Sequence, residues 1–184
     1  MDTISTAMKT TPSRIYGEIR QGRPFRLPQQ ELAVGVLRTG DVLHHSIDRA
    51  LAPCGVSNEQ YNALRILRGV GADGHPTLEI ARRLISRSAN ITRLVDKLVD
   101  KGLARRDRDA DDRRQAVIRI TPAGERVLAR GDAAVNALLA RLGALRPAEI
   151  RAAVRLLDRI REAVEVTTVR EQLESGASPD PDPE

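Results

Sequence analysis

The chain has 184 residues, of which 41% are hydrophobic but only 2% aromatic, and its formal net charge is +5. This length suits one domain with an accessory layer, and its core must be built from aliphatic side chains. No apolar run approaches the roughly 18 residues that a membrane span needs, and the N-terminus lacks the pattern of a signal peptide. A single cysteine, Cys54, excludes an intramolecular disulfide. We therefore expect a cytoplasmic protein without a membrane partner.

The two ends of the chain are polar, and the positive charge lies between them. Residues 1–27 predict a loosely ordered N-terminal arm. Residues 170–184 contain one arginine against five acidic residues, which predicts a disordered acidic tail. Residues 80–121, in contrast, contain twelve Lys or Arg against six Asp. A basic segment inside a folded domain is typical of proteins with an anionic partner.

Helical patterns dominate the chain from residue 28 onwards. The first pattern, over 28–52, carries one apolar stripe and ends at Pro53 and Gly55. Ser57 and Gln60 have the spacing of a capping box at the start of the next helix, which runs to about residue 70. A Gly-rich stretch follows, in which we expect His75 to be exposed to solvent.

Two shorter helices come next, separated by a turn over 86–88. The first covers 78–85, with Thr77 as its expected N-cap. The second covers 88–101, with Ser88 as its expected cap and Gly102 as its C-terminal stop. On this second helix the apolar residues fall on one face, which we expect to be buried: Ile91, Leu94, Val95 and Leu98.

The stretch RDRDADDRRQAVIRIT, residues 106–121, interleaves arginine with aspartate and then alternates apolar side chains. Alternation over 116–120 is typical of a strand, and with LARR before the charged run it predicts a β-hairpin. A calcium loop is a second interpretation, but it would need Gly and Glu where Asp112 and Ile118 stand. A solvated loop without a partner is a third, and it would not explain the flanking strands.

The order of helices followed by a hairpin is that of a winged helix-turn-helix. The sequence strongly resembles the MarR family of bacterial transcription regulators over residues 35–166, through GVSNEQYNALRILRG, PTLEIARRLISRSANITRLVDKLVDKGLARRDRDADDRRQAVIRITPAG and the spacing between them. The most specific part is the wing motif D-x-R-x-x-x-x-x-I-T, which comprises Asp112, Arg114, Ile120 and Thr121. The resemblance implies a DNA-binding regulator, expected to be a ligand-responsive repressor, rather than an enzyme, and no catalytic constellation or cofactor motif is recognisable in the chain.

In this interpretation helix 88–101 enters the major groove and the wing, 104–120, lies at the minor groove. The resemblance assigns Arg114 to the minor groove and Asp112 to its orientation. Arg87, Arg108 and Arg113 are expected to contact phosphates. The remaining candidates for contacts with bases or phosphates lie on the outward face of the helix: Ser88, Asn90, Thr92, Arg93 and Lys97.

The helices 28–52, 122–143 and 147–169 have longer apolar stripes than one protomer of this size can cover, which favours a homodimer. We therefore expect a mainly α protein with a small β-hairpin wing (α+β). Its winged helix-turn-helix lobe is 57–121 and its dimerisation region is 28–56 with 122–169. Such a dimer would place two recognition helices in successive major grooves of a pseudo-palindromic operator in double-stranded DNA.

By analogy with the family, a small effector, often an anionic aromatic, binds between the dimerisation helices and the lobe. Five residues are candidates for lining that region: Arg38, His44, His45, Cys54 and Tyr61. A redox-responsive regulator using Cys54 and a metal-responsive one using His44 or His45 are alternatives. Packing of Cys54 and a partly exposed histidine pair without a metal remain the simpler interpretations. A non-specific DNA-architectural protein would use the same basic surface without an operator.

Overall fold

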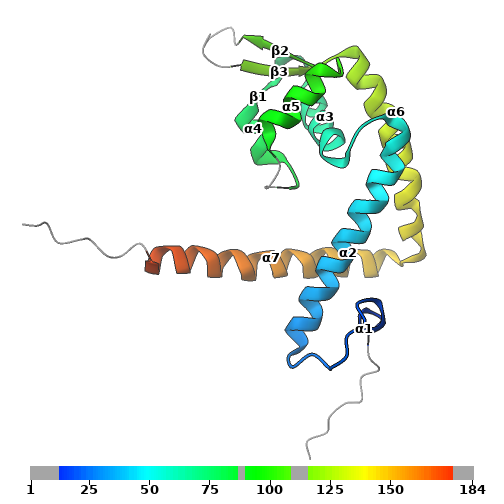
Figure 1. Cartoon of the computed structure of the whole chain (residues 1–184), viewed down its shortest axis with the longest axis vertical. Coiled ribbons are helices and arrows are strands. Elements are labelled where there is room, and N and C mark those ends of the chain that lie inside the picture. Colours follow the sequence, from blue (N-terminus) through cyan, green and yellow to red (C-terminus); the bar gives the residue numbers. More distant parts are fainter. Residues whose placement is uncertain (1–12, 87–89, 109–115, 176–184) are drawn as a thin grey trace, which may run out of the picture. The chain divides into compact units, whose positions relative to one another are not determined.

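The computed structural model describes residues 13–86, 90–108 and 116–175, except for the side chains of Ala72, Arg108 and residues 166–175. The chain divides into two compact units, residues 1–138 and 139–184. The first unit contains most of the helices and the only sheet among the described residues (Figure 1). It is mainly helical with a small antiparallel sheet, which confirms the predicted fold class.

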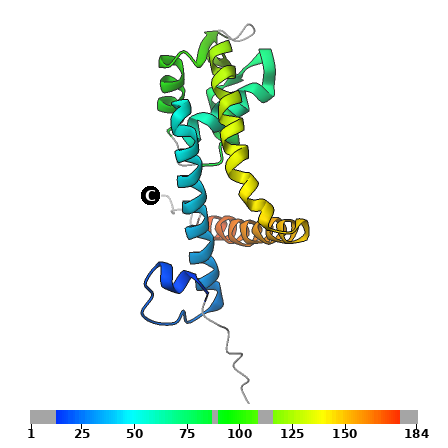
Figure 2. The same ribbon diagram turned by 90° about the vertical axis from the view of Figure 1, so that its right-hand side faces the viewer.

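The elements of the first unit follow the predicted order closely. Its helices are α1 (Ile15–Glu18), α2 (Pro28–Leu51), α3 (Asn58–Val70), α4 (Thr77–Arg83), α5 (Ile91–Asp100) and α6 (Pro122–Leu139), with short 3-10 turns η1 (Ala52–Cys54) and η2 (Gly71–Asp73). Its strands are β1 (His75–Pro76), β2 (Ala104–Arg108) and β3 (Ala116–Ile120). Helices α3 to α5 and the strands gather into one lobe, as both views in Figures 1 and 2 show.

Local hydrogen bonds explain where several of these helices begin. Ser57 Oγ accepts from the Gln60 backbone N–H (3.3 Å) and Gln60 Oε1 accepts from the Ser57 N–H (3.2 Å), so the predicted capping box is confirmed. Helix α5 is capped instead by Asn90, whose Oδ1 accepts from the Arg93 N–H at 3.1 Å, so the prediction of Ser88 as its cap is wrong. Helix α4 begins at Thr77 and its N-cap is Pro76, so the prediction of Thr77 as its cap is wrong.

The wing is a β-hairpin, as predicted, and a third strand extends it. β2 and β3 pair antiparallel from Ala104 opposite Ile120 to Arg108 opposite Ala116. β1 adds to the other edge of β3, with His75 opposite Ile118. Gly74 makes this pairing possible, because its φ is +69° and a Cβ there would lie 2.6 Å from the Ile118 carbonyl oxygen.

The core of the lobe is aliphatic, as its composition requires. Buried side chains from α2, α3, α4, α5, β3 and α6 form one cluster, in which the residues without solvent exposure are Leu51, Leu64, Ile80, Val95, Leu98, Ile118 and Leu128. Helix α5 contributes Leu94, Val95 and Leu98, which confirms most of its predicted inner face. Ile91 lies at the edge of the cluster and is half-buried.

Helical structure is present in the described parts of the predicted arm and tail. Within the arm, residues 15–18 form α1, and the rings of Tyr16 and Phe25 pack edge to face with centroids 5.1 Å apart. In the second unit, a 3-10 turn η3 (Ala140–Ala144) precedes α7 (Pro147–Ser175). Residues 170–175, predicted as part of a disordered tail, are therefore helical. Among the described residues, no helix has the length and apolar character required to cross a membrane.

Candidate nucleic-acid interface

Helix α5 presents a polar face to solvent because its apolar face is used by the core. The predicted contact residues within the described part of the helix and its cap are all exposed: Asn90, Thr92, Arg93 and Lys97. Neither Arg93 nor Lys97 forms an ion pair with any described residue. Both cations therefore remain free to meet an external anion.

A shallow cavity of about 350 Å³ runs along this face, between α5 and the N-terminus of α3. Its lining includes Arg93, Lys97 and Ser57. Lys101 extends the row of cations by one more turn, with its Nζ donating to the Gly55 carbonyl oxygen (2.7 Å) and to Gln60 Oε1 (2.9 Å). Sequence reasoning did not single out Lys101, whose two hydrogen bonds attach it to the start of α3.

The wing is joined to α5 by an ion pair that sequence reasoning did not find. Arg106 of β2 contacts Asp96 of α5, with Nη2 and Oδ1 2.8 Å apart. On the hairpin itself, Asp107 lies between two arginines, with Oδ2 2.9 Å from Arg119 Nη1 and 3.1 Å from Arg105 Nη1. Asp107 thus neutralises arginines within the hairpin, while Asp96 of α5 neutralises an arginine of the wing and connects the two elements.

Six of the predicted DNA contacts cannot be placed. Arg87, Ser88, Asp112, Arg113 and Arg114, and the side chain of Arg108, lie outside the described residues. Their roles stay predictions that rest on the resemblance.

His75 is not the solvated histidine that was predicted. Its ring is half-buried at the base of the wing, and within the described structure its buried Nε2 has no hydrogen-bond partner. Burial lowers the pKa of His75, and the charge of Arg83 lowers it further, while Glu79 opposes both. The folded protein therefore protonates this ring less readily than the unfolded chain does.

This burial predicts a pH-dependent stability. Because His75 is harder to protonate in the folded state, the unfolded chain binds more protons as the pH falls below about 6.5, and the free energy of unfolding decreases. Replacing His75 by Phe should flatten that decrease in urea unfolding series between pH 7.5 and 5. A His45→Gln variant, in which an exposed ring is lost, serves as the control. If the free energy of unfolding of His75→Phe depends on pH as that of wild type does, His75 is not the group responsible for the decrease.

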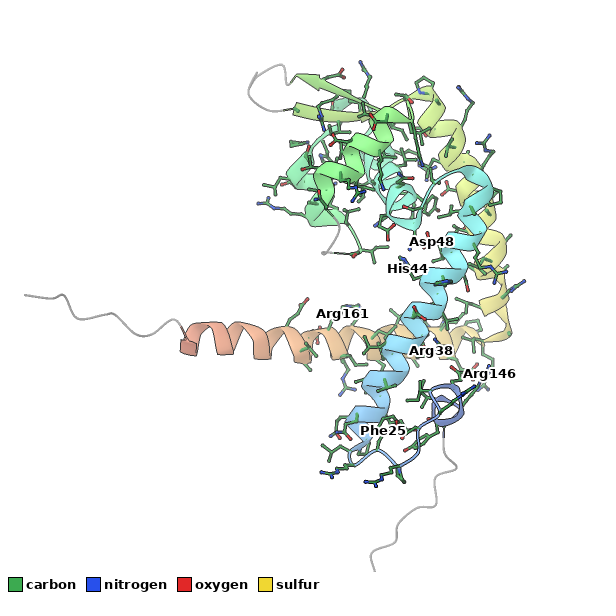
Figure 3. All side chains as sticks on the ribbon, viewed as in Figure 1. Phe25, Arg38, His44, Asp48, Arg146 and Arg161 are labelled. Carbon is green, nitrogen blue, oxygen red and sulfur yellow. The ribbon has the colours of Figure 1, made fainter. Side chains whose placement is uncertain are left out.

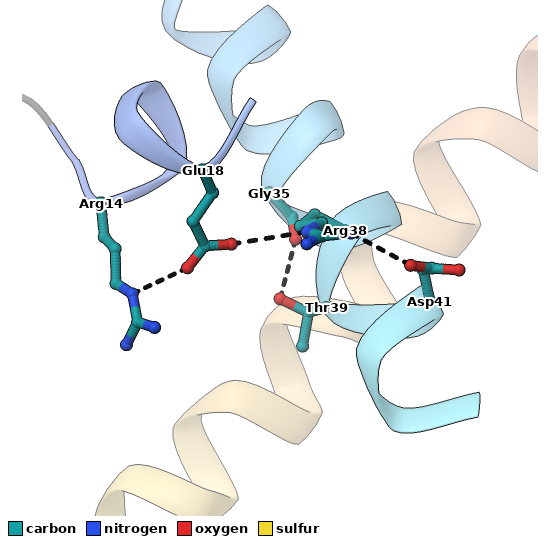
Figure 4. A network of polar contacts seen from close by, with 6 residues as sticks. All are labelled: Arg14, Glu18, Gly35, Arg38, Thr39 and Asp41. Carbon is teal, nitrogen blue, oxygen red and sulfur yellow. Dashed lines mark hydrogen bonds and ion pairs between the residues drawn. The ribbon is translucent and has the colours of Figure 1, made fainter. Parts of the chain in front are cut away.

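Arg38, the first candidate for effector binding, already has two partners on this protomer. Its guanidinium is 3.5 Å from Glu18 of α1 and 3.2 Å from Asp41 one turn along α2 (Figure 4). Glu18 also pairs with Arg14, at 2.7 Å. Arg38 thus connects the arm to α2, and its charge is balanced within the chain.

His44 lies between two carboxylates. Its Nε2 is 3.2 Å from Asp48 Oδ2 and 3.5 Å from Glu59 Oε1, and its Nδ1 is 3.1 Å from the Asn58 amide nitrogen. Figure 3 shows His44 and Asp48 as neighbours on α2, with Arg38 nearer to the start of the helix. These carboxylates do not favour an anionic ligand at His44. Among the described residues, no group of three or more His, Cys, Asp or Glu side chains is arranged to hold a metal ion.

The other candidates for effector binding do not form one site with His44. His45 is exposed, whereas Cys54 is partly buried against the core, in agreement with packing as its simpler role. Tyr61 is only 6% exposed, and its hydroxyl donates to Asp132 Oδ1 of α6 at 2.7 Å. Tyr61 is therefore enclosed between α3 and α6, and its role at a ligand site stays a prediction.

Comparison with known proteins places these features in context. The sequence profile of the MarR family matches residues 56–116, and no curated protein matches the chain. A MarR transcription factor from Planctomyces limnophilus is 34% identical, with 73% of this chain and 98% of that chain covered and a TM-score of 0.56.

Two further solved structures have the same fold. A MarR family transcriptional regulator from Streptomyces coelicolor is 24% identical over 76% of this chain and 96% of its own, with a TM-score of 0.66. CouR from Rhodococcus jostii RHA1, solved with p-coumaroyl-CoA bound, is 23% identical over 86% of this chain and 100% of its own, with a TM-score of 0.57.

Proposed function

Because this chain belongs to the MarR family of transcription regulators, we propose that it is a sequence-specific regulator which binds double-stranded DNA as a homodimer. The observation that carries this proposal is the pair of exposed cations Arg93 and Lys97 on α5, neither of which forms an ion pair with a described residue. A helix with a free polar face fits the major groove, and a β-hairpin beside it reaches the adjacent minor groove. The protein acts in the cytoplasm, where the DNA is.

We propose that different segments of the chain bind DNA and form the dimer. Residues 57–121 bind DNA, while 28–56 and 122–169 hold two protomers together. Two such lobes related by a two-fold axis would meet half-sites about one helical turn apart, so the operator is pseudo-palindromic. Exposed apolar side chains on α2 and α7, such as Leu37 and Val154 (73% and 53% exposed), support dimerisation because a monomer would leave them in water.

The test is binding of the purified full-length protein to the DNA upstream of its own gene, with a shuffled duplex of equal composition as control, over a salt series. Tight binding to the native duplex alone, with affinity that falls steeply with salt, would support the proposal. Equal binding to both duplexes would instead favour a non-specific architectural protein.

Arg114→Ala should weaken operator binding by roughly 1–3 kcal/mol, because the resemblance assigns this guanidinium to the minor groove, where the negative potential is strongest. Fluorescence anisotropy with operator DNA measures the effect. Arg151→Ala, which removes one exposed arginine from α7, is the control for net charge and should bind within about twofold of wild type. Wild-type affinity in a folded Arg114→Ala dimer would show that the wing assignment is wrong.

We also propose that a small molecule regulates DNA binding, since a protein of this fold was solved with p-coumaroyl-CoA. A ligand can change DNA affinity only if it binds the DNA-competent and incompetent states unequally. The balanced charges at Arg38 and His44 mean that an anionic effector would need cations from elsewhere. The test is a screen of a compound library that contains acyl thioesters and aromatic acids. It measures which compounds release the labelled operator from the protein.

A further inference from the structure

Asp132 of α6 contacts two side chains of α3 at once. Its Oδ1 accepts from the Tyr61 hydroxyl at 2.7 Å, and its Oδ2 accepts from Arg68 Nη1, also at 2.7 Å. Tyr61 and Arg68 are seven residues apart, so they lie two turns apart on the same side of α3. A single carboxylate therefore spans two turns of the neighbouring helix and uses both of its oxygens.

The helices are closely packed where this contact is made. A Cβ atom at Gly131, the residue before Asp132, would lie 3.0 Å from the Tyr61 ring and 3.2 Å from Leu51 Cδ2. The guanidinium of Arg65 lies 5.9 Å from the centre of the Tyr61 ring. Because Gly131 and Tyr61 are both buried, α6 meets α3 and the end of α2 at one tight joint.

The charges at this joint persist over the physiological pH range. Burial and the hydrogen bond to Asp132 raise the pKa of Tyr61 to about 12, so its hydroxyl keeps its proton. Burial tends to raise the pKa of Asp132, but the hydrogen bonds from Tyr61 and Arg68 outweigh it and lower that pKa. Asp132 thus remains a carboxylate, and both hydrogen bonds are of the strong, charge-assisted kind.

This joint lies between α3, which belongs to the DNA-binding lobe, and α6, which belongs to the predicted dimerisation region. Helix α3 packs against α4, α5 and β3 of the DNA-binding lobe, and also against α2 of the predicted dimerisation region. Helix α6 follows β3 directly and belongs by sequence to the predicted dimerisation region. The hydroxyl of Thr121 fixes the first turn of α6 through its hydrogen bonds to Gly102 and Gly124. Asp132 adds a second point of attachment further along the helix, which resists rotation of α3 against α6.

We propose that Asp132, with Tyr61 and Arg68, sets the orientation of the recognition helix relative to α6 and thereby the spacing of DNA half-sites that the dimer accepts. This inference rests on the proposed function. Asp132 is a positioning residue, since it acts through α3 rather than on DNA. A purely stabilising role would lower the free energy of unfolding without changing which half-site spacing is preferred.

The experiment compares two operators, one with the native half-site spacing and one with a single base pair inserted between the half-sites. Wild-type protein is expected to prefer the native spacing by about tenfold or more. In Asp132→Asn the side chain keeps its size but loses its charge and places an amide beside Arg68 or Tyr61. We expect this variant to bind both operators within about threefold of each other.

Tyr61→Phe removes one hydrogen bond without adding a group, so it keeps the test informative if Asp132→Asn folds poorly, and it should reduce the spacing preference in the same direction. Glu79→Gln is the matched control, because it breaks an ion pair with Arg82 that lies within α4 alone. It should preserve the preference. Circular dichroism melts of all four proteins measure the loss of stability separately.

The outcomes distinguish this inference from the proposed function. A wild-type protein that does not prefer the operator over shuffled DNA overturns the proposed function itself. Specific binding by wild type with no spacing preference overturns the role of the joint. The same holds if Asp132→Asn and Tyr61→Phe melt earlier but discriminate spacing as well as wild type does.

Discussion

Leu157→Asp should convert the proposed dimer into monomers and thereby abolish operator binding. Leu157 lies on α7 in a row of apolar side chains at three- and four-residue steps, and it is 40% exposed in the single chain. The other members of the row within the described side chains are Ile150, Val154, Ile160 and Val164. Such a row is the pattern of a helix that packs against a partner.

The expected size of this effect follows from burial. Covering a leucine side chain stabilises an interface by about 1.5–3 kcal/mol, and placing an unpaired carboxylate in the same position adds a desolvation cost. The dissociation constant of the dimer should therefore rise by about 100-fold or more. Sedimentation equilibrium measures it, and a monomer should bind a palindromic operator only weakly because it contacts one half-site.

Arg155→Asp is the matched control on the same helix. Arg155 is exposed and lies two residues before Leu157, which places it about 200° away around α7 on the polar side. The Arg155→Asp variant introduces the same aspartate outside the apolar row, so we expect this variant to remain dimeric. A Leu157→Asp protein that stays dimeric would show that α7 does not form the interface.

Gly124→Ala should be among the most destabilising single-methyl changes in the lobe. Gly124 lies in the first turn of α6, where a Cβ atom would be 2.1 Å from the Leu103 carbonyl oxygen and 2.8 Å from Ile120 Cγ1. The Thr121 hydroxyl holds this turn in place, since its oxygen accepts from the Gly124 N–H (3.0 Å) and its proton is donated to the Gly102 carbonyl (2.7 Å).

Relief of this clash requires movement of the backbone, because its nearest atom is a carbonyl oxygen rather than the end of a flexible side chain. We expect a loss of about 3 kcal/mol in the free energy of unfolding, at the upper end of the usual cost of overpacking. Urea unfolding followed by circular dichroism measures this loss. Gly69→Ala in α3 is the control, because no atom lies within 4 Å of its Cβ position and Ala favours a helix by about 0.5–1 kcal/mol. Equal stability of the two variants would contradict the packing argument.

Local signals in the sequence were sufficient for the elements whose residues interact with near neighbours. The capping box at Ser57 and Gln60, the alternation over 116–120 and the apolar face of α5 are all relations between residues a few positions apart. The cap of α5 was assigned two residues too early because Ser88 and Asn90 are both good caps. In the structure the hydrogen bond from the Arg93 N–H to the Asn90 side chain marks where the helix begins.

At the candidate nucleic-acid interface, too, some features could be predicted from local sequence patterns and others could not. Exposure of Thr92, Arg93 and Lys97 could be predicted, because on an amphipathic helix the polar side follows once the apolar side is known. The Arg106–Asp96 pair could not, since it depends on how the hairpin lies against α5.

What the sequence determined by itself was the mainly helical class, the winged helix-turn-helix order and the family, because periodicity, caps and the wing motif are written in short stretches of chain. The tertiary structure decided which polar groups meet across elements. It brought His75 into a third strand and enclosed Tyr61 beneath α6. It also joined Asp132 to Tyr61, which is 71 positions away in the sequence, and to Arg68, which is 64 positions away. Such contacts depend on the distances and angles between packed helices, which no local pattern encodes.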